Sequence, residues 1–347
     1  MSQVMKTESY YEYIKGKSIT DCAVADIGNI AFTLKEDRQD EDDTSPTEDR
    51  VTAILSYSPS RLQANHGFGH ILWREGIDKA FVAYNSVSEG ILYCDTIWNM
   101  FEGKNSPPDF QQVIPEEKQD DYTRLSLQMT HIAGEAYVTG HLRKVFKRVG
   151  IHQWVDLTDE NEHANMFKDL KELKQSTGSY LNSDAGFSAI DGFADNDIYA
   201  GGRRGDLWHY DGSRWQIVDT PFNQDIKTIT CGDDGNVYIA GYTGGIAKGR
   251  GSDWKIIDSM SGELFYSSAW FKGRLYLSGH NVTGLYILEG DEIKRYEFPE
   301  DGPKQYSFWG GVASSEDALV SYGEGQALVF DGEKWREIIG SRNLSHT

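Results

Sequence analysis

The sequence has little of what would place it in a membrane or in a disulfide-stabilised fold. It has three cysteines at wide spacing, Cys22, Cys94 and Cys231, and 8 prolines in 347 residues. An odd number of distant cysteines predicts reduced side chains in the core rather than disulfides or a metal site. No apolar run approaches the roughly 20 residues of a membrane-spanning helix, and the first residues lack the apolar stretch of a secretory signal. We therefore expect a cytoplasmic protein that does not bind membranes.

Positive charge is also scarce. Lys and Arg total 34 against 54 Asp and Glu, which gives a formal net charge of −20 at pH 7. This excess of acid disfavours binding to nucleic acid and to anionic membrane surfaces, and it favours a basic partner. The alternative is that the acidity only keeps the protein soluble.

Catalytic motifs are absent as well. The sequence contains no Gly-x-Ser-x-Gly elbow, no phosphate-binding glycine loop and no calcium loop, and its histidines are scattered. We therefore assign no catalytic residue, no metal site and no cofactor. A pair of carboxylates facing a central channel leaves no mark on a single sequence, so an enzyme with a site at the channel stays open as an alternative.

What the sequence does contain is a repeated phrase. A short apolar strand ends in Gly, a hairpin and a second strand follow, and an Asp-Gly turn leads into Trp. The clearest copy spans residues 199–215, and later copies place Tyr238, Tyr276 and Val320 after Tyr199 at spacings of 39, 38 and 44 residues. That period is typical of a four-stranded propeller blade.

Weaker copies continue towards the N-terminus, with insertions between them. Each copy has one position expected in the second strand of its blade, and these are Phe32, Val82, Val138, Tyr199, Tyr238, Tyr276 and Val320. The pattern predicts an all-β fold: a β-propeller of seven four-stranded blades in a single domain over residues 1–347, with six blades as the alternative count. The Asp-Gly pairs before Trp215 and Trp335 suit tight hairpins, and both indoles are expected to pack between blades.

The copy at residues 199–215 follows the phrase Tyr-Ala-Gly-Gly, then Leu-x-x-Tyr-Asp-Gly-x-x-Trp. In this phrase the chain resembles bacterial kelch-like and WD40-like propeller repeat proteins, and the resemblance covers roughly residues 186–340. It implies the propeller fold. It implies less about function, because such propellers serve as interaction platforms, lectins and enzymes.

Three insertions interrupt the repeats, at about residues 36–49, 103–121 and 159–180. The first has eight acidic residues and one basic residue, the second is rich in proline and predicted to be irregular, and the third has helical spacing and predicts one short amphipathic helix. The first insertion follows a second strand and the third follows an outer strand. Connections of these two kinds emerge on one face of a propeller, which marks that face as the working surface.

This face gives the candidate partner-binding residues. Arg143, Lys144, Arg203 and Arg204 form a basic group that is expected either to bind a carboxylate or phosphate, or to pair with acids of the protein itself. The full set is Asp40, Glu41, Asp42, Asp43, Arg143, Lys144, Arg203, Arg204, Tyr242 and His280.

The favoured function is non-catalytic protein binding by one elaborated acidic face, by a protein that is monomeric when free. Its sharpest version is an immunity protein that neutralises a basic bacterial toxin, because acidic surfaces speed association with cationic partners. A carbohydrate-binding propeller is an alternative, and so is the channel-site enzyme. Identical hairpin residues in several blades would favour the lectin, whereas the hairpins of this chain differ from one another.

Overall fold

The structure is a computed structural model. It describes residues 5–37, 51–60, 66–75, 80–86, 90–95, 99–103, 109–112, 126–158, 186–241, 244–257, 262–279, 284–304 and 310–340. The chain divides into two compact units. Unit 1 comprises Met1–Asp95, Phe101–Asp109 and Glu263–Thr347, and unit 2 comprises Thr96–Met100 and Phe110–Gly262.

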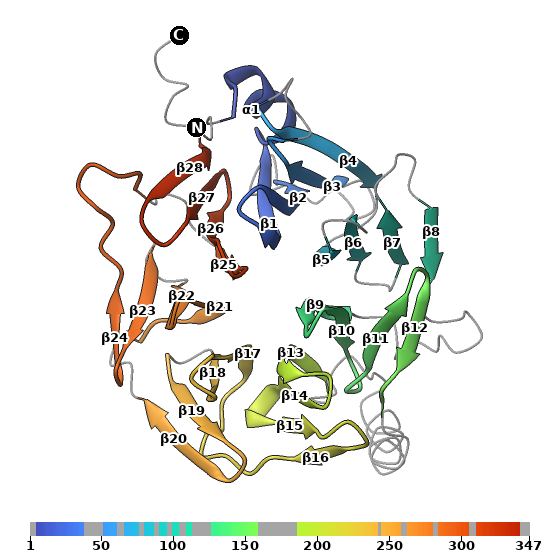
Figure 1. Cartoon of the computed structure of the whole chain (residues 1–347), viewed down its shortest axis with the longest axis vertical. Coiled ribbons are helices and arrows are strands. Elements are labelled where there is room, and N and C mark those ends of the chain that lie inside the picture. Colours follow the sequence, from blue (N-terminus) through green and yellow to red (C-terminus); the bar gives the residue numbers. More distant parts are fainter. Residues whose placement is uncertain are drawn as a thin grey trace, which may run out of the picture. The chain divides into compact units, whose positions relative to one another are not determined.

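Unit 2 contains three antiparallel sheets of four strands each, and in every sheet the strands are hydrogen-bonded in chain order (Figure 1). The first sheet consists of β9 (Ser126–Ile132), β10 (Glu135–Gly140), β11 (Val145–Gly150) and β12 (Gln153–Asp156). The second consists of β13 (Phe187–Ala194), β14 (Asp197–Gly202), β15 (Leu207–Tyr210) and β16 (Trp215–Ile217), and a 3-10 turn, η4 (Arg203–Gly205), joins β14 to β15. The third consists of β17 (Ile226–Cys231), β18 (Val237–Gly241), β19 (Ile246–Arg250) and β20 (Asp253–Ile257).

Unit 1 begins with a short helix and contains sheets from both ends of the chain. Helix α1 (Thr7–Tyr13) precedes the sheet of β1 (Lys17–Asp26), β2 (Asn29–Glu36), β3 (Val51–Tyr57) and β4 (Phe68–Glu75). The C-terminal sheets are β21 (Phe265–Phe271), β22 (Arg274–Gly279), β23 (Leu285–Glu289) and β24 (Glu292–Arg295), and β25 (Gly311–Ser314), β26 (Leu319–Gly323), β27 (Gln326–Phe330) and β28 (Trp335–Ile339). A further sheet has β5 (Ala80–Ser86) and β6 (Gly90–Asp95) in unit 1, followed by β7 (Asn99–Gly103) and β8 (Asp109–Gln112).

The described strands thus form seven four-stranded sheets. This confirms the predicted all-β propeller of four-stranded blades. A continuous run of apolar and small residues gives β14 two buried faces, because Ile198 to Gly202 are all buried. No helix among the described residues is both long enough and apolar enough to span a bilayer.

Polar side chains on the first strand of one sheet fasten the first strand of the next. In unit 2, the Gln128 amide oxygen accepts a hydrogen bond from the Ile190 N–H at 2.7 Å, and the Asp191 carboxylate accepts one from the Cys231 N–H at 2.7 Å. Unit 1 repeats this contact, from the Val82 N–H to Asp21 and from the Val312 N–H to the Ser267 hydroxyl. The contacts satisfy backbone donors that no strand partner reaches.

The repeat tryptophans fall into two groups. Trp215 and Trp335 are buried, with 5% and 6% exposure. Each indole N–H donates to the segment that follows the preceding sheet: to the Leu157 carbonyl oxygen and to the Tyr296 hydroxyl, both at 2.9 Å. They therefore pack between blades, as predicted. Trp254 instead donates to the carbonyl of Gly251 in its own hairpin and is only half-buried.

The strands differ from two of the expectations, and a third expectation lies outside the described residues. Val82 lies in the first strand β5, not in a second strand, because β5 is as apolar as the second strands of other sheets. Strand β8 lies inside the 103–121 insertion, which was predicted to be irregular. The helix expected at 159–180 falls outside the described residues, whereas α1 was not predicted.

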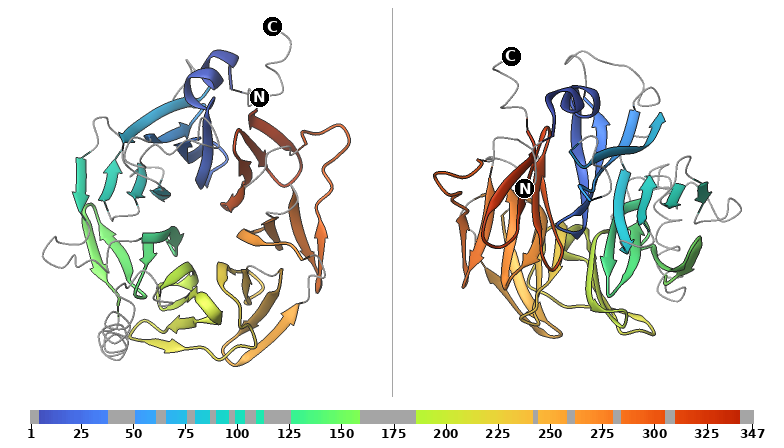
Figure 2. Two further views of the ribbon diagram at one scale, coloured as in Figure 1. Left: turned by 180° about the vertical axis from the view of Figure 1, so that it is seen from behind. Right: turned by 45° about the horizontal axis from the view of Figure 1, so that its top comes forward.

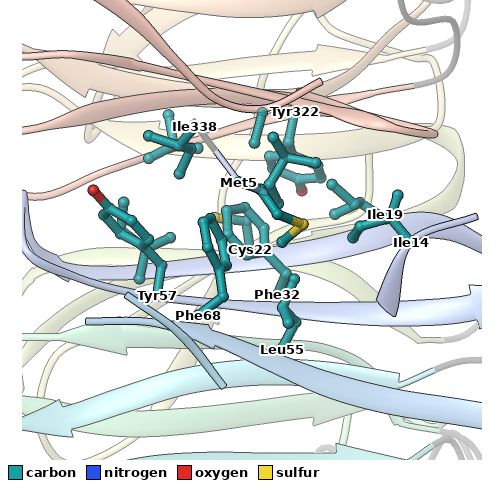
Figure 3. Packing of buried hydrophobic residues seen from close by; sticks show 14 of the residues in the cluster. Met5, Ile14, Ile19, Cys22, Phe32, Leu55, Tyr57, Phe68, Tyr322 and Ile338 are labelled. Carbon is teal, nitrogen blue, oxygen red and sulfur yellow. The ribbon is translucent and has the colours of Figure 1, made fainter. Parts of the chain in front are cut away.

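The first and last sheets share one apolar core, and α1 contributes to it. Met5, Tyr10, Tyr13 and Ile14 are buried in the same cluster as Phe32 of β2 and Ile338 of β28 (Figure 3). The Met5 N–H donates to the Ile338 carbonyl at 2.9 Å, and β1 contacts β25 and β26. Figure 2 shows the N-terminal strands in blue beside the C-terminal sheet in red within this unit. The two ends of the chain are therefore joined by packing.

Asp191 gives a first testable prediction. Burial raises the pKa of this carboxyl to about 7, although the backbone N–H groups of Cys231 and Gly192 lower it in part. Between its ordinary value of 3.8 and about 7, the folded state holds more protons than the unfolded state, so the contribution of Asp191 to stability falls as the pH rises through 7. Urea unfolding at pH 5.5 and pH 8.5 measures the free energy of unfolding of the wild type and of Asp191→Asn. The wild-type value minus the variant value should be larger at pH 5.5 than at pH 8.5. A difference that does not change with pH would contradict this.

Candidate interaction surface

The candidate residues that the structure describes lie on two hairpins of unit 2. The β10–β11 turn runs from His141 to Lys144, and the β14–β15 turn runs from Arg203 to Asp206. The central residues of each have positive φ: 59° and 54° at Leu142 and Arg143, and 55° and 73° at Arg204 and Gly205. Two consecutive left-handed residues are typical of a type I′ turn, which matches the twist of a hairpin.

Left-handed φ is unfavourable for side chains as large as Leu and Arg, so the surroundings must hold these turns. Leu142 is 2% exposed and anchors its turn in the core. At Gly205 a Cβ would clash with the carbonyl oxygen of Phe222, so only glycine fits. The turns are therefore fixed by packing rather than by turn-forming residues alone.

Arg143 connects the two hairpins. Its Nε and one terminal nitrogen donate to the two carboxylate oxygens of Asp206 at 2.8 and 3.0 Å, which is a bidentate ion pair. The guanidinium also lies 4.8 Å from the ring centre of Trp208, and the Trp208 indole donates to Asp206 at 2.8 Å. Arg143 is therefore engaged within the protein, and its contribution to a surface is to hold neighbouring sheets together.

Lys144 is paired within the protein as well. Its Nζ lies 3.3 Å from a carboxylate oxygen of Asp156, at the end of β12. The other oxygen of Asp156 accepts the Thr158 N–H at 2.8 Å. For Arg143 and Lys144 the structure thus matches internal pairing, one of the two alternatives that the sequence left open.

Arg203 and Arg204 differ from Arg143 and Lys144 in exposure, because the structure leaves both of them exposed. Hydrogen bonds fix the backbone of their turn. Within the turn, the Asp206 N–H donates to the Arg203 carbonyl at 3.0 Å. From the following segment, the Asp225 carboxylate accepts the Arg204 N–H at 3.1 Å and the Gln224 carbonyl accepts the Gly205 N–H at 2.6 Å. Two guanidinium groups are therefore presented on a fixed backbone.

The positive charge of Arg203 acts on His141. Burial lowers the pKa of His141, and the positive charge of Arg203 lowers it further, so the imidazole is neutral at pH 7. Two carboxylates lie at the same turns: that of Asp206 pairs with Arg143, and that of Asp225 accepts the Arg204 N–H.

The remaining candidates lie outside the described residues. These are Asp40, Glu41, Asp42, Asp43, Tyr242 and His280. The sequence analysis did not find Asp206, Trp208 or Asp156 as partners of the cations. Asp206 lies 63 residues from Arg143, and only the adjacency of two sheets brings them together.

Within the described ranges no group of three or more His, Cys, Asp or Glu side chains could hold a metal ion. Cys22 and Cys94 are buried, and burial raises the pKa of the Cys22 and Cys231 thiols well above the ordinary value. Thiols of this kind are poor nucleophiles, so the cysteines act as core residues, as predicted.

The four-stranded blades define the chain as a β-propeller. No family model matches its sequence. The WD40 β-propeller domain of Doa1 is similar in structure, with a TM-score of 0.60 over 100% of this chain and 98% of that one at 10% identity. PorZ, a surface component of the type-IX secretion system of Porphyromonas gingivalis, gives a TM-score of 0.57 over 94% of this chain and 39% of its own at 9% identity. At such identities the likeness shows the fold alone.

In sequence, the chain is similar to the immune protein Tsi7 of Pseudomonas aeruginosa. The two are 34% identical over 210 residues, which is 60% of this chain and 62% of Tsi7. The chain thus matches about three fifths of the length of this curated relative.

Proposed function

We propose that the protein is an immunity protein, a non-catalytic propeller that binds and neutralises a protein toxin. The similarity to the immune protein Tsi7 is the observation that supports this most directly. A propeller supplies a rigid scaffold whose connections can vary without changing the blades. The described hairpins of unit 2 fit such a role, because they place charged side chains on turns that the neighbouring sheet holds in position.

We further propose that the toxin is basic and that the protein is cytoplasmic and monomeric before it binds. The net charge of −20 supports a basic partner, since complementary charge raises the rate of encounter. We propose that the negative charge of the stretch that includes Asp40 to Asp43 contributes to this attraction.

Co-expression tests the function itself. The probes are the proteins encoded next to this chain's gene, each tested for toxicity in a bacterial host with and without this chain. We expect growth to be restored and the two proteins to purify as a stoichiometric complex. Growth arrest that persists while the chain is soluble and folded would refute the immunity function.

The salt dependence of association tests the electrostatic part separately. Exposed charges are screened beyond about 8 Å at physiological ionic strength, so the association rate should fall steeply between low and physiological salt. Stopped-flow measurements should also show slower association after neutralisation of Asp40, Glu41, Asp42 and Asp43. An association rate that does not change with salt would refute the proposal that the toxin is basic, without contradicting the proposal that the protein binds a toxin.

A further inference from the structure

Two exposed aliphatic side chains lie on neighbouring sheets of unit 2, at the ends that carry the His141–Lys144 and Arg203–Asp206 turns. Ile217, the last residue of β16, is 70% exposed, and Val155 near the end of β12 is 43% exposed. Ile217 pairs with Trp208, and the next N–H, that of Val218, donates to the Leu207 carbonyl at 2.8 Å. Because Leu207 directly follows the Arg203–Asp206 turn, Ile217 lies at the same end of the sheet as Arg203 and Arg204.

Val155 lies near the same end of the preceding sheet, where Asp156 rather than Val155 has the register position of Ile217. The next residue, Asp156, forms an ion pair with Lys144 of the His141–Lys144 turn. The Leu157 N–H donates to the Val145 carbonyl at 2.9 Å. Val155 therefore lies at the end of its sheet that carries the His141–Lys144 turn.

Cross-strand pairing shows which way the two side chains face. Val155 pairs with Lys147, which pairs with Tyr137, so these three share one face of the sheet. Ile217 pairs with Trp208, which pairs with Ala200. Tyr137, Ala200 and Trp208 pack in a single cluster between the two sheets. Val155 and Ile217 thus face the same junction from opposite sides, and the Arg143–Asp206 ion pair crosses that junction.

We propose that Val155, Ile217, Arg203 and Arg204 form a docking surface, here called the junction surface, for a segment of the partner protein that carries an apolar side chain beside carboxylates. This inference rests on the proposed function as a toxin-binding protein. The junction surface is cationic, in contrast to the acidic stretch that includes Asp40 to Asp43, so the toxin should be basic overall but acidic where it meets these arginines.

The composition of the surface fits this partner. Arginine is enriched at protein interfaces, the buried centre of an interface is more apolar than the rest of the surface, and guanidinium groups match the planar geometry of carboxylates. The backbone under Arg203 and Arg204 is fixed by hydrogen bonds to Gln224 and Asp225, so less conformational freedom is lost on binding.

Matched variants test the junction surface in the toxin complex. The test variants are Ile217→Ser and the double variant Arg203→Gln with Arg204→Gln. The controls are Ile151→Ser and Arg214→Gln, because these side chains are 64% and 68% exposed but lie on turns at the opposite end of the same two sheets. We expect the arginine pair to raise Kd about 30-fold or more, mainly through faster dissociation, and Ile217→Ser to raise it about 10-fold. The controls should stay within about twofold of the wild type, in line with the small effect of exposed residues outside an interface.

The outcomes separate this inference from the proposed function. A wild type that binds the toxin, with both test variants binding equally well, overturns the junction surface alone. If the wild type does not bind the toxin, the proposed function fails. The junction surface is then tested by adding the peptide Glu-Glu-Phe-Glu-Glu and recording the NMR spectrum of the protein. We expect chemical-shift changes confined to the two turns and the neighbouring ends of their sheets, and we expect these changes to disappear in the test variants. Unchanged spectra, or the same shifts with inorganic phosphate, would overturn it.

Discussion

Replacing Trp335 with Ala should lower the free energy of unfolding by about 3–5 kcal/mol, the range for truncation of a large buried aromatic side chain. The indole is 6% exposed and stacks on Phe330 at 4.9 Å between ring centres. It also packs on Phe298 at 5.0 Å and donates to the Tyr296 hydroxyl at 2.9 Å. Because Tyr296 and Phe298 follow the preceding sheet, the cavity would open between two blades and also leave the Tyr296 hydroxyl without this donor.

Trp254→Ala is the matched control, since Trp254 has the same place in its repeat. Its indole bonds within its own hairpin and is half-buried, so its loss should be clearly smaller than that of Trp335. Denaturant unfolding of both variants, followed by far-UV circular dichroism, measures the difference. Equal losses would show that the repeat tryptophans do not differ in their packing between blades.

The repeat made the fold predictable because its signals are local. Asp-Gly turns such as Asp211-Gly212 place positive φ at Gly212, and the continuous apolar run in strands such as β14 requires burial on both faces. The signal weakened where a sheet departs from the pattern. Val82 was placed in the wrong strand because Phe81, Val82 and Ala83 are all buried, like the residues of a second strand.

The surface was less predictable because it depends on contacts between sheets. A basic group at the two turns was visible in the sequence, but the sequence could not separate Arg143 from Arg203. Only the fold shows that Arg143 spans 63 residues to meet Asp206, while Arg203 and Arg204 remain exposed. Likewise, the sequence does not distinguish Val155 and Ile217 from other strand residues. The strand register shows that both lie near the ends of their sheets that carry the two basic turns.

Helix α1 was missed for a related reason. Seven residues are too few for a helix to be stable by itself, and Lys6 at its N-cap makes no side-chain capping bond. The helix therefore depends on the tertiary contacts of its buried residues, and no pattern in the sequence predicts those contacts.

This dependence gives the second large effect. Ile14→Ala should lower the free energy of unfolding by about 2–5 kcal/mol, because Ile14 is 1% exposed in the core that joins the first and last sheets. Tyr11→Ala is the control on the same segment: Tyr11 is 48% exposed beside Lys15, so its loss should stay within about 0.5 kcal/mol. Urea unfolding should show the large loss for Ile14 alone. If the two variants were equally stable, the N-terminal segment would not be what holds the two ends of the chain together.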